Sequence, residues 1–172
     1  DIFCARNGDI WVGGDRGLFR KRKAEDVFER IDLSSRRLGG VSSIMEDTQG
    51  NIWIAACESG LYRYDAGRNK FYTYLDPVLY FSNVVFQDDK QQIWVGTWDR
   101  GLVKLKTPYT TGRMQYDRFH RVEGEENTLY DNIVYAIEQD ELHRIWVGTR
   151  SGLSIMHDEN DFYSFENYLP GS

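Results

Sequence analysis

A fourfold internal repeat is the feature that most constrains how this chain of 172 residues can fold. In each copy a tryptophan lies between two apolar residues, and a Gly-Leu pair follows six or seven residues later. The tryptophans are Trp11, Trp53, Trp94 and Trp146, which are 42, 41 and 52 residues apart. The Gly-Leu pairs begin at Gly17, Gly60, Gly101 and Gly152. Because the copies fill the chain, each unit must form a structure that stacks on its neighbours.

Each unit contains four short runs of residues that are typical of β-strands. The runs are rich in Val, Ile, Tyr, Phe and Trp and are separated by turn residues. No stretch keeps the 3.6-residue period of a helix for long enough to form one. A repeat of about 40 to 45 residues with four strands is typical of a β-propeller blade. We therefore predict an all-β fold of four-stranded antiparallel blades over approximate repeats 1–37, 38–78, 79–127 and 128–172.

The repeated residues have structural roles in such a blade. Each tryptophan should point to one face of its sheet and its apolar neighbours to the other, so that both faces are buried against adjacent blades. The sequence DTQG, Asp47 to Gly50, predicts a hairpin turn in which the carboxylate accepts backbone N–H bonds and the glycine takes a positive φ. Gln91 and His143 replace this glycine in the last two units, so we expect their turns to differ. In three of the units a glycine follows the second-strand tryptophan and its apolar neighbour, and in the remaining unit Ala55 takes its place.

Composition and charge exclude several classes of protein. The 21 Lys and Arg residues are scattered and are outnumbered by 27 Asp and Glu, which gives a net charge of −6 and disfavours nucleic acid as a partner. The apolar stretches are far shorter than the roughly 20 residues that span a bilayer, so we expect no direct membrane insertion. Neither a signal peptide nor a zinc-type Cys/His spacing is visible, and we predict no metal and no cofactor.

Three stretches closely resemble the two-component regulator propeller repeat. Residues 41–65 (VSSIMEDTQGNIWIAACESGLYRYD) and 134–156 (VYAIEQDELHRIWVGTRSGLSIM) are nearly complete copies, and residues 92–105 (QIWVGTWDRGLVKL) carry the second half. The resemblance implies the periplasmic sensor region of a membrane-anchored hybrid histidine kinase, as found in Bacteroidetes. It also implies that this region binds oligosaccharides and switches on genes for carbohydrate utilisation.

The ends of the chain suggest that the array is incomplete. Unit one has only five residues before its first turn, and the chain stops where a fifth first strand would begin. We expect a segment of a larger propeller, of about seven blades, with a closed four-bladed ring as the alternative. The remaining blades would then be partners, and open apolar faces would favour self-association, for example as a homodimer.

Loops at the ends of the central channel are the predicted binding surface, since the strands are committed to packing. The loops between second and third strands share one face with the loops that enter each first strand. Both sets carry aromatic residues next to Asp, Asn and Arg, which suit the C–H faces and vicinal hydroxyls of sugars. The candidate ligand-binding residues are Arg16, Glu58, Tyr80, Trp98, Asp99, Arg100, Tyr130, Asp131, Asn132 and Arg150.

Trp98 is the foremost candidate because it is the one tryptophan outside the repeated column. A structural role is the alternative for each candidate. Trp98 would then pack on a neighbouring blade, the arginines would form salt bridges between blades, and Tyr80 and Tyr130 would lie in the core.

Enzymatic function finds little support in the sequence. It contains no G-x-S-x-G, no H-E-x-x-H and no phosphate-binding glycine loop. Asp99 and Asp131 would suit a propeller glycosidase or lyase only if they lay at the right separation. We therefore predict a non-catalytic sensor segment, and a protein-protein interaction scaffold is the alternative.

Overall fold

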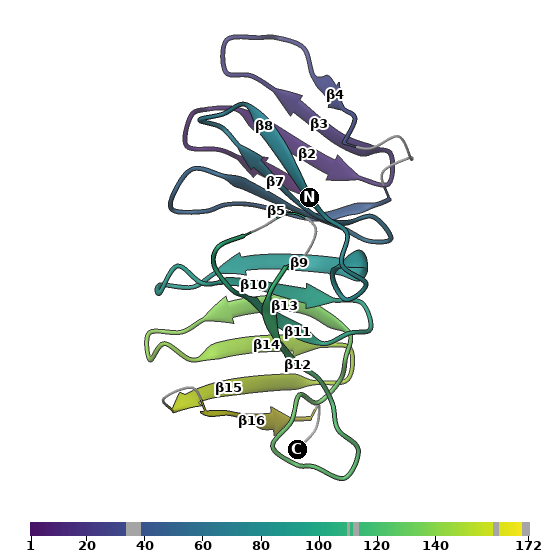
Figure 1. The fold of residues 1–172 in the computed structure, drawn as a ribbon, viewed down its shortest axis with the longest axis vertical. Coiled ribbons are helices and arrows are strands. Elements are labelled where there is room, and N and C mark those ends of the chain that lie inside the picture. The colour runs from purple at the N-terminus through teal and green to yellow at the C-terminus, as the bar shows by residue number, and fades with distance from the viewer. Residues whose placement is uncertain (34–38, 110, 112–113, 160–161, 170–172) are drawn as a thin grey trace.

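The computed structural model describes residues 1–33, 39–109, 111, 114–159 and 162–169, which form four four-stranded antiparallel sheets (Figure 1). Within these ranges the only helix is the three-residue 3₁₀ helix η1 (Leu79–Phe81). The prediction of an all-β chain built from four-stranded antiparallel blades is therefore confirmed. The boundaries of the repeats stay a prediction.

Each sheet consists of four strands that are consecutive in the sequence. Blade 1 contains β1 (Ile2–Cys4), β2 (Ile10–Gly14), β3 (Gly17–Lys21) and β4 (Glu29–Ile31). Blade 2 contains β5 (Val41–Glu46), β6 (Ile52–Ala56), β7 (Gly60–Asp65) and β8 (Lys70–Tyr74). Blade 3 contains β9 (Ser82–Gln87), β10 (Ile93–Thr97), β11 (Leu102–Leu105) and β12 (Tyr116–Phe119). Blade 4 contains β13 (Val134–Gln139), β14 (Ile145–Thr149), β15 (Leu153–Glu159) and β16 (Phe162–Tyr168).

The blades follow one another in chain order along the longest axis of the molecule (Figure 1). The first strands of successive blades contact each other, β1 with β5, β5 with β9 and β9 with β13. We call the end of the blades that carries the turns between first and second strands the turn face. The opposite end, where the chain passes from one blade to the next, is the loop face.

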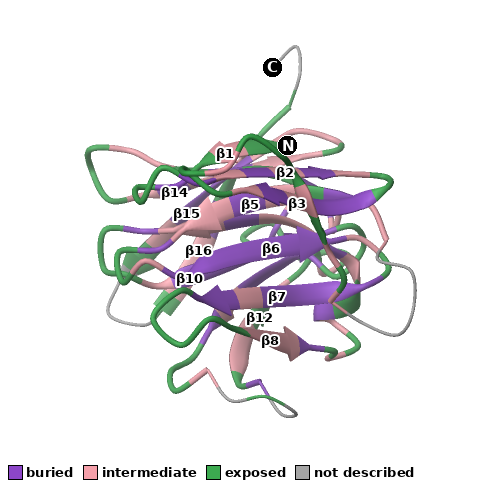
Figure 2. Cartoon of the chain, turned by 90° about the horizontal axis from the view of Figure 1, so that it is seen from above, coloured by how far each residue is buried: buried purple, intermediate pink, exposed green. Residues whose placement is uncertain are grey.

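Every interface between blades is built in the same way. A tryptophan and a leucine of one blade pack on apolar residues of the second strand of the next blade. The three clusters contain Trp11, Leu18, Ile52 and Ile54; Trp53, Leu61, Ile93 and Val95; and Trp94, Leu102, Ile145 and Val147. Neighbours along β6 thus belong to different clusters, as the sequence predicts. Figure 2 shows the result, with β6 and β7 largely buried between exposed loops.

Blade 4 exposes the face that the other three blades bury. Trp146 and Leu153 occupy the positions of the packed tryptophan and leucine, but both are only partly buried. They line an apolar cavity of about 380 Å³ with Ala136 and Gly148. This face is complementary to the second strand of a further blade, and the segment therefore belongs to a larger propeller.

The missing side chain of a second-strand glycine makes room for the next blade. A Cβ at Gly96 would overlap the side chain of Val134, which begins the first strand of blade 4. Blade 2 has Ala55 at the glycine position, and the residue that begins the next first strand is Ser82 rather than valine. The smaller serine accompanies the larger alanine, which accounts for the one exception in the repeat.

A hydrogen bond from the tryptophan closes the turn at the start of blades 2, 3 and 4. In blade 2, Asp47 accepts the indole N–H of Trp53 at 2.8 Å and also accepts backbone N–H groups of its own turn. The same indole bond joins Asp88 to Trp94 at 2.8 Å and Asp140 to Trp146 at 2.7 Å. Each aspartate therefore ties the turn to the second strand.

The expectation that the last two turns differ is wrong. Gln91 and His143 both adopt a φ of 62°, in the same left-handed region as Gly50 at 85°. Their backbone N–H groups donate to the carbonyls of Asp88 and Asp140 at 3.0 Å, as in the glycine turn. A non-glycine residue in this region costs about 1 kcal/mol or more. The bonds of the aspartate hold the turn in shape despite this cost.

The turns of neighbouring blades are also joined to each other. The N–H of Thr48 donates to Gln87 Oε1 at 2.7 Å, and the N–H of Asp89 donates to Gln139 Oε1 at 2.9 Å. In the sequence, Thr48 and Asp89 come directly after the turn aspartates of their blades. Gln87 and Gln139 come directly before the turn aspartate of the next blade. The turn face is thus locked by a repeated hydrogen bond across each interface.

Asp140→Asn should remove a pH-dependent part of the stability. Burial raises the pKa of Asp140, but hydrogen bonds from the Trp146 indole and from Arg144 outweigh it and lower the pKa from 3.8 to about 2. The ionised carboxylate therefore stabilises the folded protein above about pH 4, and this contribution is lost as the pH falls toward about 2. Urea unfolding should show the gap between the wild type and Asp140→Asn narrowing over that range. Glu141→Gln, an exposed change in the same turn, is the control, and a gap that stays constant would contradict the assignment.

Candidate functional site

The two sets of loops predicted to share one face meet on the loop face. The N–H of Trp98, in the loop between β10 and β11, donates to the carbonyl of Phe81 at 2.9 Å. The N–H of Gly101 in the same loop donates to the carbonyl of Asn132, which leads into blade 4, at 2.9 Å. This loop of blade 3 is therefore held from both sides.

Trp98 forms an exposed aromatic pair with Tyr135 of β13. The ring centroids are 5.6 Å apart and the planes meet at 70°. The two residues stay 44% and 46% exposed, so the edge contact leaves much of both rings accessible to solvent. Trp98 does touch the neighbouring blade, as the structural alternative expects, but it is not buried by it.

A β-bulge places Tyr135 on the surface. The pairing of β13 with β14 shifts between Val134 and Ala136, so Tyr135 is an extra residue without a partner on β14. The corresponding extra residues of blades 2 and 3 are Ser42 and Asn83. The three blades thus present different side chains at one position.

Sequence reasoning missed Tyr135 because VYAI was interpreted as a regular strand. Val134 and Ile137 are both buried in the interface with blade 3, although residues three apart in a regular strand face opposite sides. The spacing of Val41 and Ile44 is the same. This repeated V-x-x-I spacing was the signal of a bulge.

Two candidate carboxylates, Glu58 and Asp99, lie on the loops of blades 2 and 3 and act electrostatically on Cys57. Burial raises the pKa of the Cys57 thiol, and the negative charges of Glu58 and Asp99 raise it further. Glu58 has a φ of 60°, and Asp99 forms an exposed ion pair with Arg100 at 3.4 Å.

Tyr80 belongs to η1, which Leu79 anchors in the core. Its ring meets that of Phe81 edge to face, with centroids 5.0 Å apart, and is 40% exposed. Tyr80 is therefore a surface residue rather than the core tyrosine that the structural alternative expects.

The candidates on blade 4 are engaged in local bonds. Asp131 is buried, with Oδ1 accepting the N–H of Ile133 and Oδ2 accepting from Ser151 and from Arg150 Nε. Burial raises the pKa of Asp131, but these hydrogen bonds hold it below its usual value. Both of its oxygens are bonded, so a catalytic pair with Asp99 gains no support.

The other candidates of this region have structural partners too. Asn132 Oδ1 accepts the N–H of Arg121 at 2.8 Å. The Arg121 guanidinium lies 5.5 Å from the ring of Tyr130, which lines a separate cavity of about 660 Å³ beside β16.

All candidates except Arg16 thus fall into two groups. Those exposed on the loops of blades 2 and 3, together with two bulge residues, form what we call the mouth cluster: Glu58, Asn83, Tyr80, Trp98, Asp99, Arg100 and Tyr135. The second group, on blade 4, is Tyr130, Asp131, Asn132 and Arg150. Arg16 is exposed on blade 1 and belongs to neither group.

Comparison with known proteins agrees with the repeat pattern. The sequence model of the two component regulator propeller matches residues 37–57 and 131–151, which contain the first strands of blades 2 and 4. These two stretches are therefore similar to the two component regulator propeller repeat. Histidine kinase P4 from Formosa agariphila is 43% identical over an alignment 70 residues long, which covers 36% of this chain and 5% of the kinase.

Two solved structures extend the similarity to almost the whole segment. The extracellular domain of BT3049 from B. thetaiotaomicron, described as a hybrid two component system, is 26% identical with a TM-score of 0.74. The alignment covers 98% of this chain and 22% of that one. For the extracellular domain of BT4673 the identity is 25%, the TM-score 0.76 and the coverage 92% and 21%. The chain thus spans about a fifth of these extracellular domains.

The positions of Trp53 and Trp98 predict effects of very different size for the same substitution. Trp53→Ala removes a fully buried side chain from an interface and should lower the free energy of unfolding by about 3 to 5 kcal/mol. Trp98→Ala removes an exposed ring and should lower it by about 1 kcal/mol or less. Chemical denaturation of both variants measures the difference. A large loss for Trp98→Ala would show that this ring is part of the packing.

Proposed function

We propose that the chain is the ligand-sensing propeller part of a membrane-anchored hybrid two-component sensor kinase. In this proposal it binds an oligosaccharide at the mouth cluster, without catalysis, and so regulates genes for carbohydrate utilisation. The similarity to extracellular domains of hybrid two component systems supports the sensor role and a periplasmic location. No helix in the described part of the chain is long and apolar enough to cross a bilayer. The membrane anchor and the kinase would lie elsewhere in the parent protein.

The exposed pair of Trp98 and Tyr135 is the observation that carries the sugar proposal. Large aromatic rings bury 150–250 Å² each when covered, so leaving two of them side by side in water is unfavourable unless a ligand covers them. Two rings at 70° form a corner that offers one ring face and one ring edge to a sugar. The C–H face of a pyranose would stack on one ring, as apolar surface does on aromatic side chains.

The polar residues of the mouth cluster suit the hydroxyl groups of the same ligand. Asn83 Nδ2 donates to the carbonyl of Val134 at 2.8 Å, which fixes this side chain beside the residue that precedes Tyr135. Its amide oxygen and the carboxylates of Glu58 and Asp99 are acceptors for hydroxyl protons, and Arg100 is a donor. Charged partners strengthen such bonds relative to neutral ones.

The location of the mouth cluster also suits a signalling role. Its residues come from blades 2, 3 and 4, so a bound ligand would contact three blades at once. A ligand drives a kinase only if it binds one arrangement of the sensor better than another. We therefore place the response in the packing of this segment against the other blades or against a second copy, for which the open face with Trp146 is available.

Calorimetry with a panel of oligosaccharides tests this proposal, using the longest form of the protein that contains residues 1–172. One class of sugar should bind saturably, and Trp98→Ala and Tyr135→Ala should each weaken the affinity by about tenfold, or roughly 1.4 kcal/mol. Arg16→Ala, on the same face but outside the mouth cluster, is the matched control and should bind as the wild type does.

Two outcomes would overturn the proposal. Unchanged affinity in both aromatic variants would place the sugar elsewhere on the protein. Absence of binding across the panel, in protein shown to be folded, would favour the alternative of a protein-protein interaction scaffold.

A further inference from the structure

Blade 1 lacks the aspartate that closes the turn in the other three blades. Ala5 stands at this position, yet the turn keeps its backbone bonds, from the N–H of Ala5 to the carbonyl of Asp9 at 2.9 Å and from Gly8 to Ala5 at 2.8 Å. Trp11 is packed like the other interface tryptophans and is only 1% exposed. Its indole N–H donates to none of the described residues, whereas Trp53, Trp94 and Trp146 all donate to an aspartate.

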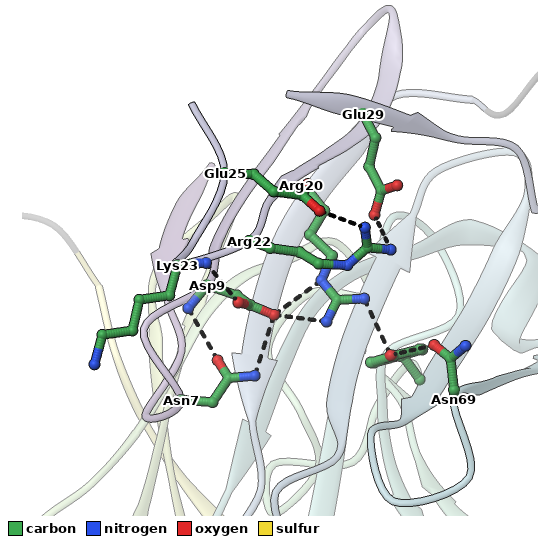
Figure 3. Close-up of polar contacts among 9 residues, drawn as sticks. Asn7, Asp9, Arg20, Arg22, Lys23, Glu25, Glu29 and Asn69 are labelled. Carbon is green, nitrogen blue, oxygen red and sulfur yellow. Dashed lines mark hydrogen bonds and ion pairs between the residues drawn. The ribbon is translucent and has the colours of Figure 1, made fainter. Parts of the chain in front are cut away.

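A different polar network replaces part of the missing carboxylate (Figure 3). The N–H of Asp9 donates to Asn7 Oδ1 at 2.9 Å, in place of the turn aspartate. Asp9 Oδ2 accepts from Arg20 Nη2 at 2.6 Å, and Arg20 Nη1 donates to the hydroxyl of Tyr64 in blade 2 at 3.0 Å. The Tyr64 hydroxyl in turn donates to Asn69 at 2.7 Å. This network satisfies Asp9 and Arg20 but leaves out the indole of Trp11.

A second donor of the turn lacks its carboxylate as well. In blades 2 and 4, the N–H groups of Gln49 and Leu142 donate to the turn aspartate at 2.9 Å. The equivalent residue of blade 1 is Asn7, whose backbone N–H donates to none of the described residues. Because the backbone bonds of the turn are the same, this N–H and the indole N–H point toward the place that a carboxylate fills in the other blades.

That place is a cavity rather than packed protein. A cavity of about 370 Å³ lies on the turn face between blades 1 and 2, lined among others by Ala5, Arg6, Trp11, Gln49, Ile52 and Tyr64. Ile52 and Tyr64 give it an apolar wall, and Trp11 and Asn7 contribute the donors. These donors have no acceptor among the described residues, so an acceptor that enters the cavity can form the hydrogen bonds that the turn aspartate forms in the other blades.

The carboxylates near the cavity, Glu46 and Asp9, each form an ion pair with an arginine. Arg6 Nε lies 3.1 Å from Glu46 at the exposed side of the cavity, and Arg20 is paired with Asp9. The Arg20 guanidinium is 5.0 Å from the centroid of the Trp11 ring. Each nearby carboxylate thus has a cationic partner, and a further carboxylate would meet donors rather than an unpaired negative charge.

We propose that this cavity is a binding site for a small organic carboxylate. One carboxylate oxygen accepts the indole N–H of Trp11 and the other accepts the backbone N–H of Asn7, as the two oxygens of the turn aspartate do in blades 2 and 4. The organic part of the ligand packs against Ile52 and Tyr64. The ligand takes the place of the aspartate side chain that blades 2, 3 and 4 carry. The site is on the turn face and is independent of the mouth cluster.

Titration with sodium acetate and sodium propionate tests the site through the indole ¹⁵N–H resonances of the protein. The resonance of Trp11, assigned with Trp11→Phe, should move downfield and saturate, while those of the other four tryptophans stay in place. Sodium chloride at matched ionic strength is the control. No movement of the Trp11 resonance, or equal movement with chloride, would overturn the proposal.

Ala5→Asp and Asp47→Ala provide the matched variants. Ala5→Asp supplies the carboxylate from the chain itself, so the Trp11 resonance should lie downfield without acetate and its response should fall at least tenfold. Ala5→Ser, a smaller change, should weaken the response in the same direction. Asp47→Ala opens the equivalent position in blade 2 and should make the Trp53 resonance respond. An undiminished Trp11 response in folded Ala5→Asp would show that acetate acts elsewhere.

Discussion

The structure depends on the packing of the second-strand tryptophan of each blade against the next blade. Trp53 lies fully buried between blades 2 and 3, while Ile52 and Ile54 on either side of it are buried between blades 1 and 2. One second strand therefore serves two interfaces, which is why the repeat restores its tryptophan and its apolar neighbours together. This double burial commits the faces of the sheets to packing and leaves the turns and loops at their ends for other roles.

The sequence predicts the blades well because these burial demands are periodic. It predicts the turns less well, since the preference for glycine at positive φ is weaker than the hydrogen bonds of the aspartate, and Gln91 and His143 adopt the glycine conformation. It also cannot separate exposed loop residues from bonded ones. Trp98 and Asp131 look alike as candidates, but only the contacts show that Trp98 is half-exposed and that Asp131 is bonded at both oxygens.

Blade 1 shows how far one unit can depart from the repeat. With Ala5 in place of the turn aspartate, blade 1 loses the acceptor for the indole N–H and for two backbone N–H groups of the turn. Asn7 Oδ1 accepts one of these three, the N–H of Asp9. The ion pair of Asp9 with Arg20, 2.6 Å long and almost fully buried, adds a tie to Tyr64 of blade 2. Packing of Trp11 is thus preserved by new polar contacts, while the space and the donors of the lost carboxylate persist beside it.

The two ends of the blades differ in how much variation they allow. On the turn face, Gln87 and Gln139 bind backbone groups of the preceding blade, so their side chains are fixed by the geometry of the interface. At the loop end of the first strands of blades 2, 3 and 4, the bulge adds one residue that pairs with nothing on the second strand. Because this residue has no partner on the second strand, it can be serine, asparagine or tyrosine without changing the pairing of the other residues. The bulge therefore lets a surface side chain vary from blade to blade, and Tyr135 beside Trp98 is the result in blade 4.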